Sequence, residues 1–208
     1  MREGRVFPLE EGFPIARIVT VAIAQLGPIR RNESRQEVVG RLITLMEEAA
    51  RMRCDLVVYL EAALTAFFPH WWIESEHEME SWFERSMPNP SVQPLFDTAK
   101  RVQIGFHLGY AELASENGRK RRLNTAVLID KMGELIGKYR KMHLPGYDDL
   151  RPGDPFQNLE KRYFTVGDLG CPVWHAFGGR IGMMICNDRR WPEAYRVMGL
   201  LRWSPLAG

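Results

Sequence analysis

A cysteine at position 186 ends a strongly apolar run and precedes a polar segment that leads into a helix. Residues 181–185 predict a buried strand, and Pro192 suits the first turn of the helix that follows. The turn between this strand and this helix, a strand-to-helix elbow, exposes a side chain at the sheet edge and points backbone N–H groups at it. This favours the thiolate form of a cysteine over the thiol. We therefore interpret Cys186 as a candidate nucleophile. The local pattern alone also fits a small core residue.

Two other residues have the types that a sulfur nucleophile requires, namely a base and an oxyanion stabiliser. Glu61 stands directly after the apolar residues 56–60 and is a candidate general base. Lys141 follows a strand in a basic segment, and strand alternation places it on the same face as Tyr139. Each residue also has an ordinary alternative. Glu61 could be a strand-end glutamate that reaches solvent, and Lys141 could belong to a solvated basic face.

Alternating strand and helix patterns surround these residues. Hydrophobic periodicity predicts strands at 17–25, 55–60, 104–112, 123–130, 134–139, 172–177 and 180–186. It predicts helices from Asn32 or Ser34 to about 52, at 78–85 and 92–102, near 159–163, and from 192 through 198. This order predicts an α/β protein with helices packed on a sheet. No glycine-rich phosphate loop follows a strand, which argues against a nucleotide-binding domain.

The composition and net charge of the chain limit the classes of partner that we expect. The 208 residues are 45% hydrophobic and 26% charged, with a net charge of +2, so we expect neither nucleic acid nor a membrane as a partner. The basic residues 119–122 follow a turn signal and are interpreted as a solvated hairpin tip. Three scattered cysteines favour a reducing, cytoplasmic location. His70 and His77 do not have the spacing of a metal site.

Taken in order, the candidate residues resemble the Glu-Lys-Cys triad of the nitrilase superfamily of carbon–nitrogen hydrolases. The segment 186–193, Cys-Asn-Asp-Arg-Arg-Trp-Pro-Glu, is most similar to the N-carbamoyl-D-amino-acid amidohydrolase branch. Further segments share this resemblance at 25–29, 64–69, 120–125, 139–144 and 159–164. The resemblance covers roughly residues 18–200 and implies the α-β-β-α sandwich fold of that superfamily.

The resemblance also implies roles for eight residues. Cys186 would attack the carbamoyl carbon of an N-carbamoyl-D-amino acid, Glu61 would move protons, and Lys141 would hold the oxyanion with a backbone N–H near Asn187. Glu160 would support Lys141 as a second family glutamate. Arg189 and Arg190 would bind the substrate carboxylate, because a guanidinium matches a carboxylate in two hydrogen bonds. His143 and Asn187 would be polar contacts in the pocket. No metal or organic cofactor is implied.

The chain departs from the family pattern at two positions and at its end. Leu60 replaces a common proline before the glutamate, and Asn158 stands where close relatives often carry histidine. We expect an irregular extension over residues 1–14, a hydrolase domain over 15–200 and an aberrant tail over 201–208, which would leave the sandwich incomplete. If folded, the chain is expected to form a homo-oligomer. The alternatives are a β-ureidopropionase, an aliphatic amidase, or a truncated remnant without activity.

Overall fold

The computed structural model describes residues 18–116 and 118–201. The extension expected at 1–14 and all but the first residue of the expected tail lie outside these residues. The elements follow the order β1 (Val21–Ile23), α1 (Arg35–Arg51), β2 (Leu56–Val58), η1 (Phe68–His70), α2 (Glu76–Ser81), α3 (Gln93–Val102), β3 (Gly105–Glu116), β4 (Arg119–Ile129), β5 (Leu135–Arg140), α4 (Glu160–Tyr163), β6 (Val173–Ala176), β7 (Gly179–Gly182), η2 (Cys186–Arg190) and α5 (Pro192–Leu201), where η marks 3-10 helices.

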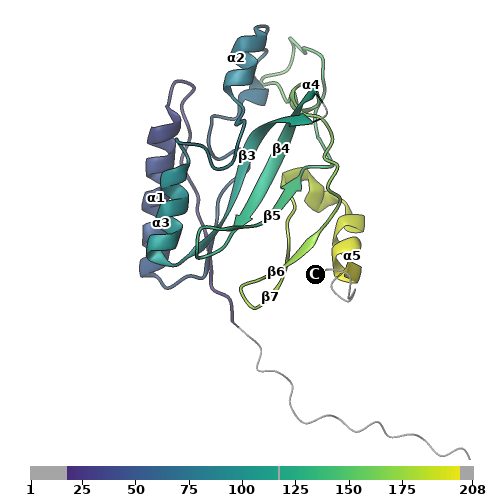
Figure 1. Cartoon of the computed structure of the whole chain (residues 1–208). Coiled ribbons are helices and arrows are strands. Elements are labelled where there is room, and N and C mark those ends of the chain that lie inside the picture. The colour runs from purple at the N-terminus through teal and green to yellow at the C-terminus, as the bar shows by residue number, and fades with distance from the viewer. Residues whose placement is uncertain (1–17, 117, 202–208) are drawn as a thin grey trace, which may run out of the picture.

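A mixed five-stranded sheet forms the centre of the molecule (Figure 1). The strands lie in chain order, with β1, β2 and β3 parallel and with β4 and β5 added as antiparallel neighbours. The parallel strands are joined by helical connections, as parallel strands require. The strands β6 and β7 form a separate hairpin. The predicted α/β class is therefore confirmed.

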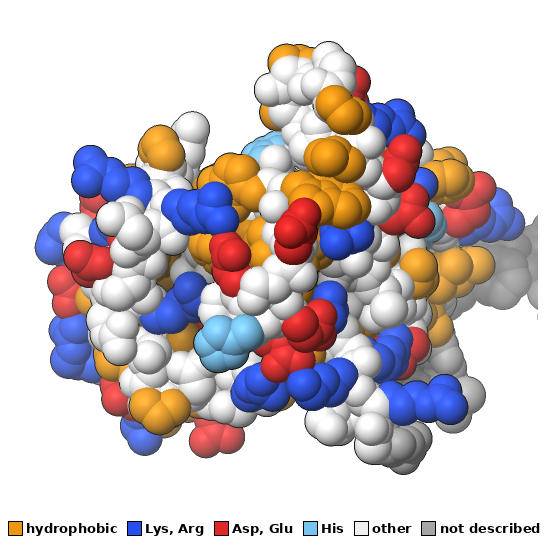
Figure 2. Space-filling view, turned by 90° about the horizontal axis from the view of Figure 1, so that it is seen from above, with side chains coloured by type: hydrophobic (Ala, Val, Ile, Leu, Met, Phe, Trp, Pro, Cys, Tyr) orange, Lys and Arg blue, Asp and Glu red, His pale blue; other side chains and the backbone are white. Residues whose placement is uncertain are grey.

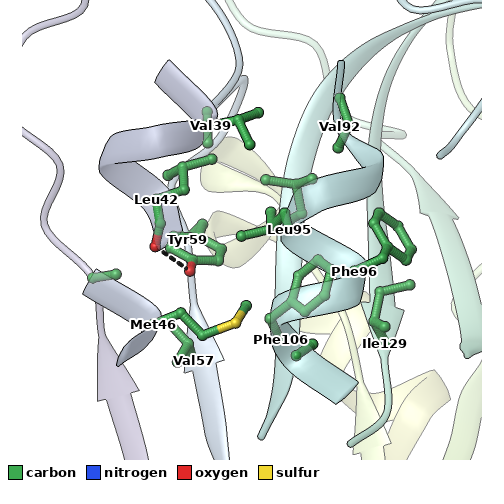
Figure 3. Packing of buried hydrophobic residues seen from close by; sticks show 14 of the residues in the cluster. Val39, Leu42, Met46, Val57, Tyr59, Val92, Leu95, Phe96, Phe106 and Ile129 are labelled. Atoms are coloured by element: carbon green, nitrogen blue, oxygen red, sulfur yellow. Dashed lines mark hydrogen bonds between the residues drawn. The ribbon is translucent and has the colours of Figure 1, made fainter. Parts of the chain in front are cut away.

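Helices α1 and α3 cover one face of the central sheet. Helix α1 is capped by Ser34, one of the two predicted caps, and the Ser34 side chain accepts a hydrogen bond from the Glu37 backbone N–H in a capping box. Its buried face contributes Leu42 and Met46 to an apolar cluster with residues of α3 and the strands (Figure 3). The Tyr59 hydroxyl donates to the Leu42 carbonyl at 2.7 Å, so the polar end of this buried ring is satisfied.

The β6–β7 hairpin covers part of the opposite face. Leu128 and Tyr139 of the central sheet belong to one buried cluster with Ala176 and with the residues after β7, Met183 and Ile185. The strand predicted at 180–186 is shorter than expected, since β7 ends at Gly182. Residues 183–185, which lead to Cys186, therefore have no regular secondary structure, and Met183 and Ile185 are held by packing in this cluster.

The β3–β4 hairpin is longer than the sequence indicates, so the basic residues 119–122 lie in strand β4. Lys120 pairs with Glu80, Arg121 with Glu116 and Asp168, and Arg122 with Glu76. Basic and acidic side chains are intermingled on the face shown in Figure 2. The prediction that residues 119–122 form a solvated hairpin tip was therefore wrong in its bounds. Regular strand pairing extends to residue 119, where ion pairs across the hairpin and to α2 support it. No helix among the described residues has the length and apolarity to cross a membrane.

Gly109 of β3 allows the backbone that carries Glu61 to cross the sheet closely. A Cβ atom there would lie 2.7 Å from the Leu60 carbonyl oxygen and 2.9 Å from the Glu61 Cα. The turn is fixed further by the hydrogen bond from the Ala63 N–H to the Gly109 carbonyl, at 2.8 Å. Both contacts are backbone atoms that cannot rotate away.

We therefore expect Gly109→Ala to lower the free energy of unfolding by about 1–3 kcal/mol, the usual cost of overpacking. The matched control is Gly40→Ala in α1, where no atom lies within 4 Å of the added methyl group. That control is expected to stabilise the protein by about 0.5–1 kcal/mol, because alanine loses less entropy in a helix. Denaturant unfolding measures both, and equal effects of the two variants would contradict the close crossing at Gly109.

Candidate active site

A buried lysine lies at the centre of the site. Lys141 directly follows β5 and is fully buried. Its Nζ atom lies 2.6 Å from Oε1 of Glu61 and 2.6 Å from Oε2 of Glu160. Burial acts most strongly on its pKa and lowers it, but the charges of the two glutamates outweigh burial, so the pKa of Lys141 is raised. The ammonium is therefore a fixed positive charge.

Glu61 is held by two donors in the turn that follows β2. Besides the Lys141 ammonium, Nδ2 of Asn124 donates to the same Oε1 atom at 2.6 Å. Asn124 lies in β4 and is buried, whereas the Glu61 side chain retains 18% exposure. Sequence reasoning did not assign Asn124 a role, although an amide beside Leu123 in an apolar strand is a signal of a buried polar contact.

Glu160 begins the short helix α4 and is almost fully buried. Burial, followed by the negative charge of Glu61, raises its pKa to about 7. Glu160 is therefore partly protonated near neutral pH. The expected position of Glu160 beside the lysine agrees with this geometry.

Cys186 occupies the first position of η2, with a left-handed φ of 45°. Its thiol has a raised pKa, first because of burial and next because of the negative charge of Glu61. The sequence expectation that the elbow favours thiolate was therefore wrong. The carboxylates and the surrounding protein outweigh the attraction of Lys141, and the expected helix begins at Pro192, after the short 3-10 helix η2 that carries Cys186. The thiol consequently requires a base to remove its proton.

A cavity of about 440 Å³ joins these groups to solvent. Glu61, Glu160 and Cys186 line it together with Asn187, Arg189 and Arg190, and its other lining residues are Phe67, His70, Pro145, Phe156 and Asn158. Neither guanidinium has an ion-pair partner among the described residues. The cavity thus presents a thiol, two carboxyl groups and two guanidinium groups in one space.

His143 contacts Asp188 and Trp191 and is not among the residues that line the cavity. Its Nδ1 atom is 2.8 Å from Oδ1 of Asp188, and its ring stacks on Trp191 with a centroid distance of 4.8 Å. Its backbone carbonyl accepts a hydrogen bond from the Asn187 side chain at 3.0 Å. Of the predicted site residues, His143 and the buried Lys141 are therefore not lining residues. No group of three or more potential metal ligands is assembled within residues 18–116 and 118–201.

Comparison with known proteins defines the family of this site. The carbon-nitrogen hydrolase family model matches residues 20–203, so the chain belongs to the carbon-nitrogen hydrolase family. A relative is the N-carbamoylputrescine amidase of Solanum lycopersicum, 27% identical over 187 residues, which are 88% of this chain and 55% of that protein. The β-ureidopropionase of Arabidopsis thaliana is 38% identical over 77 residues, 37% of this chain and 17% of that protein.

Comparison of structures places the fold in the same family. The crystal structure of a carbon-nitrogen hydrolase from Helicobacter pylori G27 superposes with a TM-score of 0.69 at 27% identity, over 88% of this chain and 56% of that one. The nitrilase-type fold is therefore established. The chain spans little more than half the length of the tomato enzyme and of the bacterial structure. These relatives do not single out the N-carbamoyl-D-amino-acid branch, which stays a prediction.

The raised pKa of Glu160 predicts a pH-dependent contribution to stability. Its folded value of about 7 lies above the ordinary value of 4.5. The folded protein therefore keeps a proton that the unfolded chain releases, and this contribution is complete below the lower value and lost as pH rises through the upper one. We expect the stability of Glu160→Gln, relative to the unsubstituted protein, to improve as pH rises across this window. Urea unfolding at several pH values measures it, and a constant difference would contradict the raised pKa.

Proposed function

We propose that this chain carries the hydrolytic centre of an enzyme that removes the carbamoyl group from N-carbamoyl amino acids, with the D-series as the preferred substrates. The observation that carries the proposal is the single cavity that joins Cys186 and its glutamates to Arg189 and Arg190. Family membership supports the class of reaction. The preference for the D-series rests on the similarity of segment 186–193 to that branch.

The first half of the reaction begins with a protonated Cys186 thiol and the Glu61 carboxylate. Glu61 accepts the proton of the Cys186 thiol as sulfur attacks the ureido carbon, which requires a base because the pKa of the thiol is raised. The carbonyl oxygen becomes an oxyanion, and the positive charge of Lys141 stabilises it. The adduct collapses when Glu61 returns the proton to the terminal nitrogen. Ammonia leaves, and a thiocarbamate links the sulfur to the amino acid.

The second half uses the same groups on water. Glu61 takes a proton from a water molecule as its oxygen attacks the thiocarbamate carbon, and the carbon–sulfur bond breaks with return of the proton to Cys186. The released N-carboxy amino acid loses carbon dioxide and leaves the free amino acid. Both halves require a carboxylate that accepts a proton and later returns it, and the hydrogen bonds that Lys141 and Asn124 donate to Glu61 hold this carboxylate in place.

The arginine pair supports a substrate with a carboxylate. The tomato relative is named for carbamoylputrescine, which carries an amine beyond its ureido group, and the Arabidopsis relative for ureidopropionate, which carries a carboxylate. Two guanidinium groups without acidic partners would repel the first and attract the second. A β-ureidopropionase is therefore the second candidate, with the spacing between ureido and carboxylate groups as the distinguishing property.

Incubation with N-carbamoyl-D-phenylglycine is expected to release ammonia, and Cys186→Ala is expected to abolish that release because no other group supplies the attacking sulfur. Cys54→Ala, which changes a thiol packed on the α1–α3 side of the sheet, is the matched control and should keep its activity. An ammonia assay measures the three proteins. Equal release by Cys186→Ala would overturn the assignment of the nucleophile.

The proposed role of Arg189 and Arg190 in carboxylate binding is tested by comparing a charged with an uncharged substrate. We expect Arg189→Gln and Arg190→Gln each to lower kcat/KM for the N-carbamoyl amino acid by about 10–100-fold, because a hydrogen bond to a charged group contributes about 1.5–3 kcal/mol. The corresponding carboxamide substrate, which lacks the negative charge, should lose much less. Arg196→Gln, an exposed change in α5 away from the cavity, is the control. Equal losses on both substrates would argue against carboxylate recognition.

A further inference from the structure

Asp188 in η2 is a fully buried carboxylate that accepts four hydrogen bonds. Its Oδ1 atom accepts from the backbone N–H of His143 at 2.9 Å and from the Nδ1 atom of the same ring at 2.8 Å. Its Oδ2 atom accepts from the Tyr139 hydroxyl at 2.7 Å and from the Ile185 N–H at 3.0 Å. A buried charge of this kind is tolerated because every acceptor site is used.

The four donors belong to two segments that carry the reacting groups. Tyr139 and His143 stand two residues before and two residues after Lys141, and Ile185 immediately precedes Cys186. One carboxylate therefore connects both flanks of the lysine to the turn of the nucleophile. The same two segments are also joined by the hydrogen bond from the Asn187 side chain to the His143 carbonyl.

Asp188 also closes the turn around the nucleophile. Its backbone N–H donates to the Ile185 carbonyl at 3.0 Å, while its carboxylate accepts from the Ile185 N–H. Cys186 lies inside this reciprocal pair with a φ of 45°, which is an unfavourable conformation for a residue with a Cβ atom. Such conformations persist where the surrounding bonds determine them. The hydrogen bonds of Asp188 thus hold the sulfur in its position.

A carboxylate is the one side chain that suits these neighbours. Asparagine has a single acceptor oxygen, and its NH₂ group would face two donors. Burial first, and the contact with Asp188 next, raise the pKa of Tyr139, so its hydroxyl keeps the proton that it donates. Asp188 itself lies outside the set of residues that line the cavity, so it has no surface for a substrate.

We infer that Asp188 is a positioning residue that fixes Cys186 relative to Lys141 and Glu61 and thereby sets both the reactivity of the thiol and the alignment for attack. The part of this inference that concerns turnover rests on the proposed function. The part that concerns the thiol does not require any substrate, so the two are tested separately.

The experiment compares Asp188→Asn with the unsubstituted full chain in two measurements. The first is the rate of Cys186 alkylation by iodoacetamide against pH, followed by peptide mass spectrometry. Release of the turn moves the sulfur away from the negative charge of Glu61, so the midpoint is expected to fall toward that of an ordinary thiol. The second is ammonia release, where kcat is expected to fall about a hundredfold with KM nearly unchanged, because misalignment by about 1 Å costs this much.

Two further variants keep the inference falsifiable. Tyr139→Phe removes one donor and keeps the charge of Asp188, so it should shift the alkylation midpoint in the same direction by a smaller amount, and it decides the question if Asp188→Asn does not fold. Glu112→Gln is the matched control, since Glu112 is another buried carboxylate whose partners Lys138, Arg140 and Thr125 lie away from the cavity. It should lower the melting temperature without moving the midpoint.

Several outcomes would overturn the inference. A folded Asp188→Asn variant with a lower melting temperature but an unchanged midpoint and kcat would make Asp188 a purely structural residue. An unchanged midpoint in Tyr139→Phe, when Asp188→Asn is unfolded, would do the same. Failure of every carbamoyl substrate, combined with the expected shift in alkylation, would overturn the proposed function and support the positioning role.

Discussion

The site depends on one buried ammonium group between two glutamates. An ion as deeply buried as Lys141 is costly unless partners compensate for its lost hydration, and Glu61 and Glu160 do so at 2.6 Å each. Meeting this requirement brings together three segments separated by 80 and 19 residues. The glycine at the crossing of β3 and the amide of Asn124 are consequences of that convergence, since each lets the Glu61 turn reach the lysine.

Strand β5 separates this cluster from a second one. Tyr139 faces the β6–β7 layer, where it contacts Asp188. The next residue, Arg140, points to the other side and bonds with Glu112, Glu116 and Asp168. Alternation along the strand thus keeps the buried Lys141 cluster and the partly exposed Arg140 cluster on opposite faces.

Sequence reasoning predicted the parts that local patterns determine. The capping residue Ser34 and the periodic apolar positions of α1 define that helix without reference to the rest of the chain. The ordered Glu61, Lys141 and Cys186 led to the site because the family resemblance connects them, whereas each residue alone had an ordinary alternative. The full length of β4 was missed, because ion pairs with Glu76 and Glu80 from α2 were not visible in the pattern.

Properties that depend on residues distant in the chain could not be predicted from the sequence. The pKa of Cys186 is set by burial and by carboxylates from distant segments, so a rule for isolated helix starts gave the opposite direction. Asn124 and Asp188 were missed for the same reason, since their partners stand 63 and about 45 positions away. A single sequence shows that such polar residues are present and does not show which donors they meet.

The raised pKa of Cys186 also bears on chemical damage. Cys186 is the exposed cysteine of the three, and thiolates rather than thiols are the species that peroxide converts to sulfenic acid. Desolvation and the negative charge of Glu61, which raise the pKa of this thiol, therefore also slow its oxidation. A cysteine that is open to solvent is in this way protected by its own proton.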